Sequence, residues 1–223
     1  MKVTLKYKHQ EIEGVETFVF EPSEPVDWQP GQYMHYVFDH PDADDRGTER
    51  WFTISAAPYE EHLQITTRVD GDPESSFKQA LMNLKEGESF EADGPKGKFL
   101  LQEGDHMHIL IAGGIGITPY RSQLAQLAHD NQPANAVLLY LNRYEKFLFE
   151  RELDGFAVKD NTLQIKKIVD KKLTRQDLKP YADDPKSIFY LSGPKAMVEA
   201  YESILYSLNV PEEQVMTDYF PGY

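Results

Sequence analysis

Three glycines and a threonine follow an apolar run in the stretch ILIAGGIGITPYRSQL, residues 109–124. A glycine-rich turn between a buried strand and a helix lets the backbone approach a phosphate closely, and the helix dipole attracts the anion. Gly113, Gly114 and Gly116 stand where such a turn is expected, and the Thr118 hydroxyl can either donate to a ligand or cap the helix. The spacing differs from the dinucleotide fingerprint G-x-G-x-x-G. The strand, the glycine-rich turn and the following helix together still predict a nucleotide site. The alternative is that the turn is only a tight structural connection.

A second glycine turn occurs in the stretch IFYLSGPKAMVEA, where Ser192, Gly193 and Pro194 separate an apolar strand from a predicted helix. The carboxyl ends of parallel strands meet at one edge of a sheet, so two such turns can face one extended ligand, such as a dinucleotide. A third strand ends there at Arg143, which is either a solvated charge or a partner for a 2′-phosphate. No acidic residue follows that strand immediately to hold a ribose diol. The sequence thus favours NADP over NAD.

A third candidate lies earlier, in RWFTISAAP, residues 50–58. The alternation of a strand places Arg50 and Phe52 on one face and Thr53 on the other. An arginine for phosphate, an aromatic ring for stacking and a hydroxyl for a heteroatom suit a flat phosphorylated ligand. The alternative is an ordinary barrel strand with a core phenylalanine and a surface arginine.

The elements that must position these residues change character near residue 104. The first part holds short alternating runs separated by turn residues, which predict an antiparallel β-barrel or sandwich. Strands and helices alternate in the second part, which predicts a parallel, Rossmann-like sheet covered on both faces. We therefore expect a β + α/β chain with domains 1–103 and 104–223. The predicted strands are 3–9, 16–21, 33–39, 50–55, 63–69, 98–101, 108–112, 136–142, 163–169, 187–191 and 214–220, and the predicted helices are 75–84, 119–130, 147–156, 174–182 and 195–208.

Composition narrows the function. The chain has 223 residues and no cysteine, which excludes a disulfide framework, a thiolate nucleophile and Cys-ligated metal or iron–sulfur centres. Its net charge of −14 opposes a nucleic-acid partner. No apolar run approaches the roughly 20 residues of a membrane span, and the amino-terminal residues lack a signal core. The seven histidines are scattered, so no metal site is expected. We expect a cytoplasmic, soluble protein whose charge suits either small-molecule chemistry or binding to a basic protein partner.

The order of these motifs resembles the ferredoxin–NADP reductase superfamily, whose members join an antiparallel flavin-binding barrel to a nucleotide-binding domain. RWFT stands where the family has Arg-x-Tyr-Ser/Thr. The resemblance covers nearly the whole chain. Its motifs, in the family's order, are WQPGQY (28–33), RWFT (50–53), RVDGDPESSF (68–77), GPKGKF (94–99), GGIGITP (113–119), LNR (141–143), LSGPKAMV (191–198) and DYFPGY (218–223).

The resemblance implies a role for each matching residue. In the barrel, it implies that the flavin phosphate pairs with Arg50, that the ring lies against Phe52 and that its N5 edge meets Thr53. It gives Thr53, Thr118 and Ser192 the positions nearest to hydride transfer. The remaining cofactor contacts that it implies are Arg68, Ser75 and Ser76 for the phosphate, Gly113, Gly114, Gly116 and Pro119 for the nicotinamide nucleotide, Gly193, Pro194 and Met197 for the nicotinamide, Arg143 for the adenosine ribose, and Phe220 or Tyr223 for the flavin face.

Three departures from the family pattern bear on this expectation. Phe52 replaces a tyrosine, Ser192 replaces a common cysteine, and Asp218 is shorter than a common glutamate. The expected function is still transfer of hydride from NADPH or NADH to bound FAD, or FMN, without an iron–sulfur cluster. The acceptor would be ferredoxin, flavodoxin, free flavin or another protein. The alternatives are a non-catalytic electron-transfer or regulatory subunit, and an interaction protein that has lost its cofactors.

Overall fold

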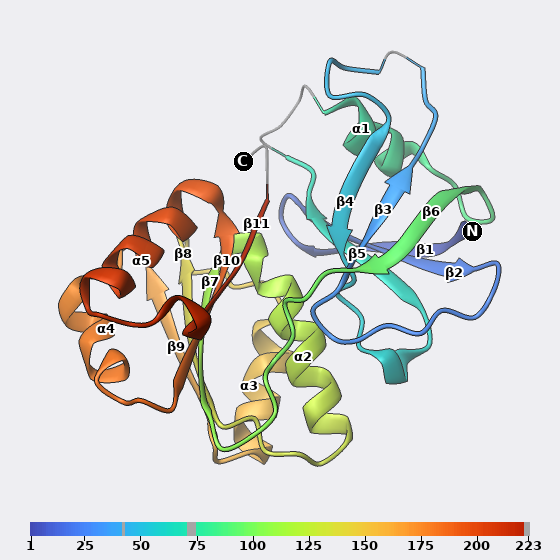
Figure 1. Cartoon of the computed structure of the whole chain (residues 1–223). Coiled ribbons are helices and arrows are strands. Elements are labelled where there is room, and N and C mark those ends of the chain that lie inside the picture. Colours follow the sequence, from blue (N-terminus) through green and yellow to red (C-terminus); the bar gives the residue numbers. More distant parts are fainter. Residues whose placement is uncertain (42, 71–74, 221–223) are drawn as a thin grey trace. The chain divides into compact units, whose positions relative to one another are not determined.

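The computed structural model describes residues 1–41, 43–70 and 75–220 (Figure 1). The chain divides into two compact units, Met1–Lys98 and Phe99–Tyr223. This division falls five residues before the boundary that the change in sequence pattern predicts, at 103/104. The reason is Phe99, whose ring packs on Tyr120 and Tyr190 and whose carbonyl oxygen accepts a hydrogen bond from Gln123 at 2.7 Å.

The first unit is a six-stranded antiparallel sheet in the order β4-β3-β6-β1-β2-β5. The two end strands, β4 and β5, also contact each other, so the sheet curls into a barrel. Alternating apolar side chains fill its interior, with Phe18, Phe20, Tyr36 and Ile65 wholly buried. The elements are β1 (Lys2–Ile12), β2 (Val15–Pro22), β3 (Tyr33–Val37), β4 (Glu49–Thr53), η1 (Pro58–Glu60), β5 (Leu63–Arg68), α1 (Ser76–Asn83) and β6 (Ser89–Lys96).

One strand of this barrel differs from the sequence prediction. The predicted strand 98–101 is not a strand, and β6 precedes it instead. Within β6 only Phe90 and Ala92 point into the core, between charged residues, so the apolar alternation is too short to stand out.

The second unit is a five-stranded parallel sheet in the order β11-β10-β7-β8-β9. Helices α2 and α3 cover one face, and α4 and α5 cover the other (Figure 1). The strands are nearly continuous apolar runs, as a sheet buried on both faces requires. The elements are β7 (Met107–Gly113), η2 (Gly114–Ile117), α2 (Thr118–His129), β8 (Ala136–Asn142), α3 (Glu150–Lys159), β9 (Leu163–Val169), α4 (Arg175–Ala182), β10 (Ser187–Pro194), α5 (Lys195–Ser207), η3 (Glu212–Gln214) and β11 (Val215–Phe220).

Two boundaries in this unit also differ from the prediction. Strand β10 continues through Ser192, Gly193 and Pro194, because β11 pairs alongside it as far as Phe220. These three residues are therefore the last of a strand rather than a turn. Helix α3 begins at Glu150, because Phe149 has a left-handed backbone with φ of 58°.

Among the helices of the described ranges, none combines the length and apolar character needed to cross a membrane. The longest, α5, has 13 residues, against the roughly 20 that a span requires.

Candidate functional site

The carboxyl edge of the parallel sheet gathers most of the predicted nucleotide residues. Gly113 ends β7, Thr118 begins α2, and Ser192 lies near the end of β10 in register with Ala112. Arg143 follows the last residue of β8. Residues that are 80 positions apart in sequence thus meet at one edge, where parallel α/β sheets bind ligands.

Two of the glycines at this edge, Gly116 and Gly193, are required by close backbone approach. A Cβ on Gly116 would lie 2.2 Å from the carbonyl oxygen of Ser192, and one on Gly193 would lie 3.1 Å from the backbone of Gly113. A Cβ on Gly113 would meet side chains only, with the Met197 sulfur 2.4 Å away. The end of β10 and the turn after β7 therefore pack directly on each other. Gly116 and Gly193 thus fit the tight structural connection that the sequence leaves as an alternative.

Gly114 differs from its neighbours. Its φ is +53°, and the nearest atom to an added Cβ is the Asn142 side-chain oxygen, 4.0 Å away. Glycine is favoured here by its backbone conformation, while the space above its α-carbon stays open. Of the four glycines, Gly114 is the one that leaves room for a ligand at this edge.

The Ser192 hydroxyl lies at the centre of this edge. The residue is wholly buried, and its Oγ has no hydrogen-bond partner within the described part of the chain. A buried hydroxyl without a partner is unfavourable by about 1–3 kcal/mol. Within the described residues, the buried side-chain oxygens Tyr36 Oη, Gln123 Oε1 and Ser187 Oγ likewise have no partner, and each such group calls for an explanation.

Asp218 stands beside Ser192 on the next strand, β11, in register with it. Burial raises the pKa of the Asp218 carboxyl to about 6. Burial also raises the pKa of Tyr120 well above its usual value, and the nearby charge of Asp218 adds to that effect. The Tyr120 hydroxyl, on α2, donates to the Ile111 carbonyl oxygen at 3.3 Å. Sequence reasoning passed over Tyr120, although it comes directly after the Thr118-Pro119 motif.

The other residues predicted to bind the nucleotide at this edge differ in their burial and in their contacts. Thr118 is buried, and its hydroxyl donates to the Ile115 carbonyl oxygen at 3.1 Å, so it neither caps α2 nor is free to donate elsewhere. Pro119 is buried in the first turn of α2. Pro194 is exposed, and the partly buried Met197 covers Gly113 and Gly193.

The adenosine end of the predicted site holds one residue that the sequence analysis missed. Arg143 is exposed after β8, as predicted. Asp170 follows β9, and its backbone N–H donates to the Asn142 carbonyl oxygen at 2.9 Å. An acidic residue therefore does lie beside the end of β8, supplied by the neighbouring strand, which weakens the sequence argument for NADP.

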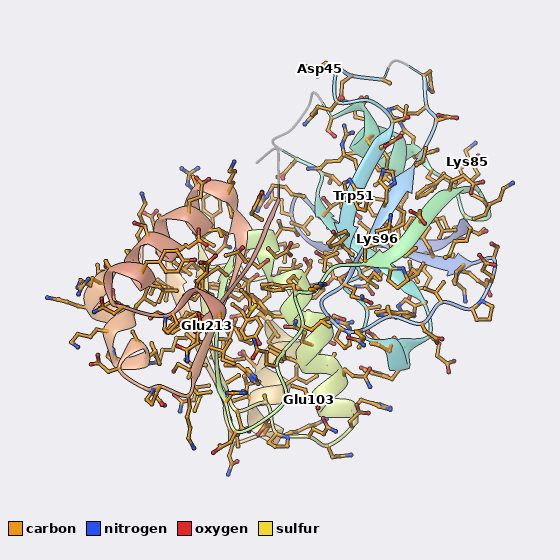
Figure 2. The ribbon with its side chains drawn as sticks, viewed as in Figure 1. Asp45, Trp51, Lys85, Lys96, Glu103 and Glu213 are labelled. Carbon is orange, nitrogen blue, oxygen red and sulfur yellow. The ribbon has the colours of Figure 1, made fainter. Side chains whose placement is uncertain are left out.

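In the first unit, β4 presents Arg50 and Phe52 on one face, as its alternation predicts. Both lie against Phe77 of α1: the Arg50 guanidinium is 5.4 Å and the Phe52 ring 5.9 Å from its centroid. Thr53 is buried at the end of the strand. On the opposite face Trp51 is 49% exposed and stacks on His35 at 4.2 Å, with the Lys96 ammonium 5.1 Å from its ring (Figure 2).

The Arg50 side chain is held within its own loop. Its Nη1 donates to the carbonyl oxygens of Arg46, Gly47 and Glu49 at 2.9, 3.1 and 2.6 Å. Its Nη2 donates to the Asp44 carboxylate at 3.2 Å. The guanidinium group of an arginine can form two parallel hydrogen bonds with a phosphate. In this structure the anion that accepts from Arg50 is the Asp44 carboxylate. The arginine predicted to hold a phosphate is thus placed for an anion.

The remaining predicted flavin contacts fall around the start of α1. Ser75 is the N-cap, accepting from the Lys78 N–H at 3.4 Å. The Ser76 hydroxyl contacts His40 Nε2 at 2.9 Å and accepts from the Asp44 N–H at 2.9 Å. Arg68 pairs with Asp70 at 3.2 Å. The side chain of Phe220, Tyr223 and the segment 71–74 lie outside the described residues.

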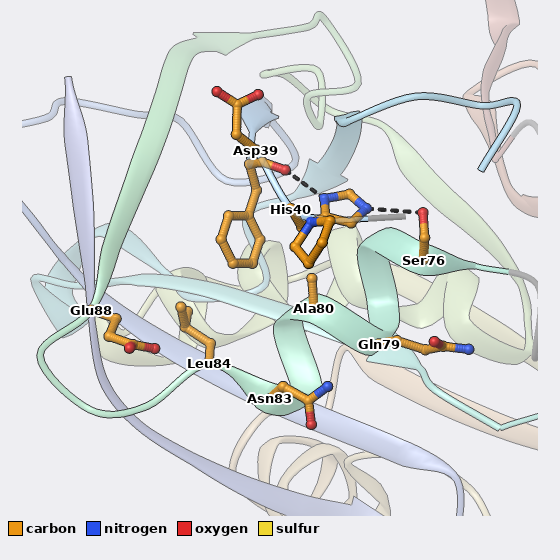
Figure 3. Close-up of a pocket in the computed structure, with 10 residues that line it drawn as sticks. Asp39, His40, Ser76, Gln79, Ala80, Asn83, Leu84 and Glu88 are labelled. Atoms are coloured by element: carbon orange, nitrogen blue, oxygen red, sulfur yellow. Dashed lines mark hydrogen bonds between the residues drawn. The ribbon is translucent and has the colours of Figure 1, made fainter. Parts of the chain in front are cut away.

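A cavity of about 400 Å³ lies between α1 and the segment that follows β3 (Figure 3). Its polar lining includes Asp39, His40, Ser76, Asn83 and Glu88, and the residues of the Arg50 motif are not part of it. Two carboxylates and no arginine or lysine make it unsuited to a phosphate. In the described ranges, neither these side chains nor any other group forms a cluster that could hold a metal ion.

In the comparison with known proteins, the match to a family model lies within the second unit of the chain. Residues 110–203 match the family model described as "Oxidoreductase NAD-binding domain". A flavohemoprotein from Candida albicans is 30% identical over 240 residues, covering 96% of this chain and 58% of that protein. The chain spans just under three fifths of the length of the curated relatives that it matches first.

Solved structures share the fold of both units. The flavohem-like FAD/NAD-binding domain of nitric oxide dioxygenase from Vibrio cholerae superposes with a TM-score of 0.83, at 21% identity and with 98% of each chain covered. Ferredoxin–NADP+ reductase from Plasmodium falciparum also gives 0.83, at 19% identity, covering 98% of this chain and 95% of that chain. At these identities the likeness is one of fold.

Proposed function

We propose that this chain is a flavoprotein of the ferredoxin–NADP reductase superfamily, which binds flavin in its barrel and accepts hydride there from NADPH or NADH. The match of residues 110–203 to an NAD-binding family model and the shared fold of both units support this proposal. FAD is the proposed flavin, with FMN as the alternative. Electrons then pass to an acceptor: ferredoxin, flavodoxin, free flavin or another protein. Many protein acceptors of this kind are acidic, so a chain with a net charge of −14 needs a local basic surface to bind them.

The observation that carries the proposal is the buried Ser192 hydroxyl without a partner. It lies at the carboxyl edge of a parallel sheet, where nucleotides bind, and within residues 110–203 that match an NAD-binding family model. A nicotinamide amide group that donates to or accepts from Ser192 Oγ would satisfy that hydroxyl. The open space above Gly114 gives the nucleotide room to approach the backbone.

Bound flavin and nicotinamide supply the hydride and electron chemistry themselves, so the protein's part is orientation and electrostatics. In the proposed roles, Ser192 and the end of β10 hold the nicotinamide, while Phe52 and Arg50 hold the flavin ring and phosphate. Asp218 is the group near Ser192 that can hold or release a proton close to neutral pH, since burial raises its pKa to about 6. Positioning of this kind can account for much of the acceleration in hydride transfer.

The test is to record the visible absorption spectrum of the purified chain under anaerobic conditions, before and after the addition of NADPH and then of NADH. Bleaching of a flavin band within seconds is the expected result. A flavin spectrum that neither nucleotide changes would instead favour a non-catalytic electron-transfer or regulatory subunit. A colourless protein that also fails to bind added FAD and FMN would contradict the proposal.

A further inference from the structure

Resting on the flavin site proposed above, we propose that the Asp44 carboxylate occupies the position of the flavin phosphate. The barrel thus carries, in Asp44, an internal competitor for its own cofactor. Binding of a phosphorylated flavin then requires Asp44 to leave, which makes this side chain a determinant of cofactor affinity.

The first support is the set of donors around Asp44. Its carboxylate accepts from Arg50 Nη2 at 3.2 Å, from Arg46 Nη2 at 3.0 Å and from the backbone N–H of Ser76 at 3.0 Å. The backbone N–H of Arg46 donates to it as well, at 2.9 Å. Two guanidinium groups and the first N–H of a helix are donors of the kind that bind a phosphate monoester or diester. The carboxylate uses them all.

The second support is charge. Burial by itself would raise the pKa of Asp44, but hydrogen bonds from Arg46 and from the Ser76 N–H, with the Arg46 charge, hold it well below its usual range. The carboxylate is therefore ionised at any pH at which the protein would be handled. A phosphate placed on the same donors would meet a like charge at contact distance, so the two anions exclude each other.

The third support is the way in which the loop is attached. Three hydrogen bonds join the loop to Ser76. The Ser76 N–H donates to the Asp44 carboxylate, the Ser76 hydroxyl accepts from the Asp44 N–H, and the same hydroxyl contacts His40 Nε2. Figure 3 shows the last of these. Departure of the Asp44 carboxylate breaks the first of these bonds, whereas the other two do not involve that carboxylate. Arg50 keeps its three bonds to backbone carbonyl oxygens, so its guanidinium stays in place for the incoming phosphate.

The experiment compares two flavins that differ by one phosphate group. The 223-residue chain, freed of any bound flavin, is titrated with FMN and with riboflavin, and binding is followed by quenching of flavin fluorescence. Asp44→Asn removes the charge and keeps the shape, and Asp44→Ala is a second variant in case the amide preserves the loop contacts. Asp45→Asn is the matched control, because this exposed neighbour lies on the same loop and loses the same charge (Figure 2).

We expect both Asp44 variants to bind FMN about tenfold or more tightly than the wild type, as loss of a competing charge-assisted contact implies. Riboflavin affinity should stay within about twofold, and Asp45→Asn should change neither affinity by more than that. Far-UV circular dichroism confirms that the variants are folded.

Three results would overturn the inference, and they are distinct. Weaker FMN binding by both variants would mean that Asp44 positions Arg50 for the phosphate. An equal gain for FMN and riboflavin, or no gain for either, would mean that Asp44 does not compete with the phosphate. If neither the wild type nor the variants bind any flavin, the proposed function fails as well.

Discussion

Ser192 and Asp218 are register partners on adjacent parallel strands, so their side chains leave the sheet on the same face. One is a hydroxyl without a hydrogen-bond partner among the described residues, and the other is a carboxyl whose pKa burial raises to about 6. Neither arrangement favours the stability of the ligand-free chain. Residues that lower stability and lie together at a ligand-binding edge are typical of functional sites.

Ser192→Ala should stabilise the ligand-free protein and slow its reduction. Removing a buried hydroxyl that lacks a partner should raise the free energy of unfolding by about 1 kcal/mol. The rate of flavin reduction by the nicotinamide nucleotide should fall about tenfold, because the proposed contact to the nicotinamide is lost. Urea denaturation and anaerobic stopped-flow absorbance measure the two effects.

The matched control is Ser187→Ala. Ser187 lies at the other end of β10, and its buried Oγ likewise has no partner within the described residues. It should gain similar stability with no change in the reduction rate. Equal slowing by both variants would mean that Ser192 acts only through packing.

Asp218→Asn should stabilise the protein at pH 8 and leave it nearly unchanged at pH 3. The carboxyl has a pKa of about 6 when folded and 3.8 as a free side chain. A raised pKa of a carboxyl gives stability that is full below the unfolded value and is lost as the pH rises from about 4 through about 6. The amide does not titrate, so its advantage at pH 8 should be about 3 kcal/mol.

Urea denaturation of the wild type and of Asp218→Asn at several pH values tests this sign. An advantage of the amide that shrinks as the pH rises would contradict it. Asp183→Asn serves as the control, since this exposed carboxylate lies at the end of α4.

Gly116→Ala and Gly114→Ala should separate folding from binding. A Cβ at position 116 would lie 2.2 Å from the Ser192 carbonyl oxygen, so the backbone must move, and we expect a loss of at least about 3 kcal/mol of stability. At position 114 the Cβ meets open space, and the left-handed backbone costs about 1–2 kcal/mol.

The contrast between the two alanine variants is the measurement. Gly114→Ala should raise the KM for the nicotinamide nucleotide while the bound flavin stays in place, and Gly116→Ala should lower the melting temperature most. A Gly114 variant with normal KM would show that the open space is not used by the nucleotide.

Arg143→Ala and Asp170→Asn should move nucleotide preference in opposite directions. If Arg143 pairs with a 2′-phosphate, its loss should lower kcat/KM for NADPH about tenfold more than for NADH. Loss of the Asp170 carboxylate should favour NADPH, because a like charge near the 2′-phosphate is removed. Ferricyanide serves as the acceptor in these assays.

Arg151→Ala, at an exposed position of α3, is the control for general charge effects. Equal changes for both nucleotides would rule out a role in this choice.

Much of the fold is readable from the sequence because its signals are local. Residues 136–142 and 163–169 are strands with the predicted bounds, and Thr174 caps α4 by accepting from the Asp177 N–H, as predicted. The strand β6 is missed because only two of its residues face the core. The extension of β10 through Pro194 is missed because it depends on pairing with β11, which no local pattern encodes.

The site is readable only in part, for the same reason. The types and order of Arg50, Phe52 and Ser192 are visible in the sequence. The structure places Arg50 and Phe52 on one face of β4, as their alternation predicts, whereas Ser192 lies within β10 and not in the predicted turn. The partners of these residues are not visible. Asp44 reaches Arg50 through a loop, and Asp170 reaches the end of β8 from a neighbouring strand. Contacts between distant segments are fixed by tertiary packing.

The four hydrogen bonds that tie Arg50 to its own loop bear on how the protein matures. A binding site whose cation depends on a cofactor for its counter-charge tends to fold only when the cofactor is present. Here the counter-charge is encoded in the polypeptide, so the barrel can assemble as it leaves the ribosome and receive its cofactor afterwards. Under the proposed function, cells starved of riboflavin should accumulate this protein in a folded, colourless form that binds flavin when the vitamin returns.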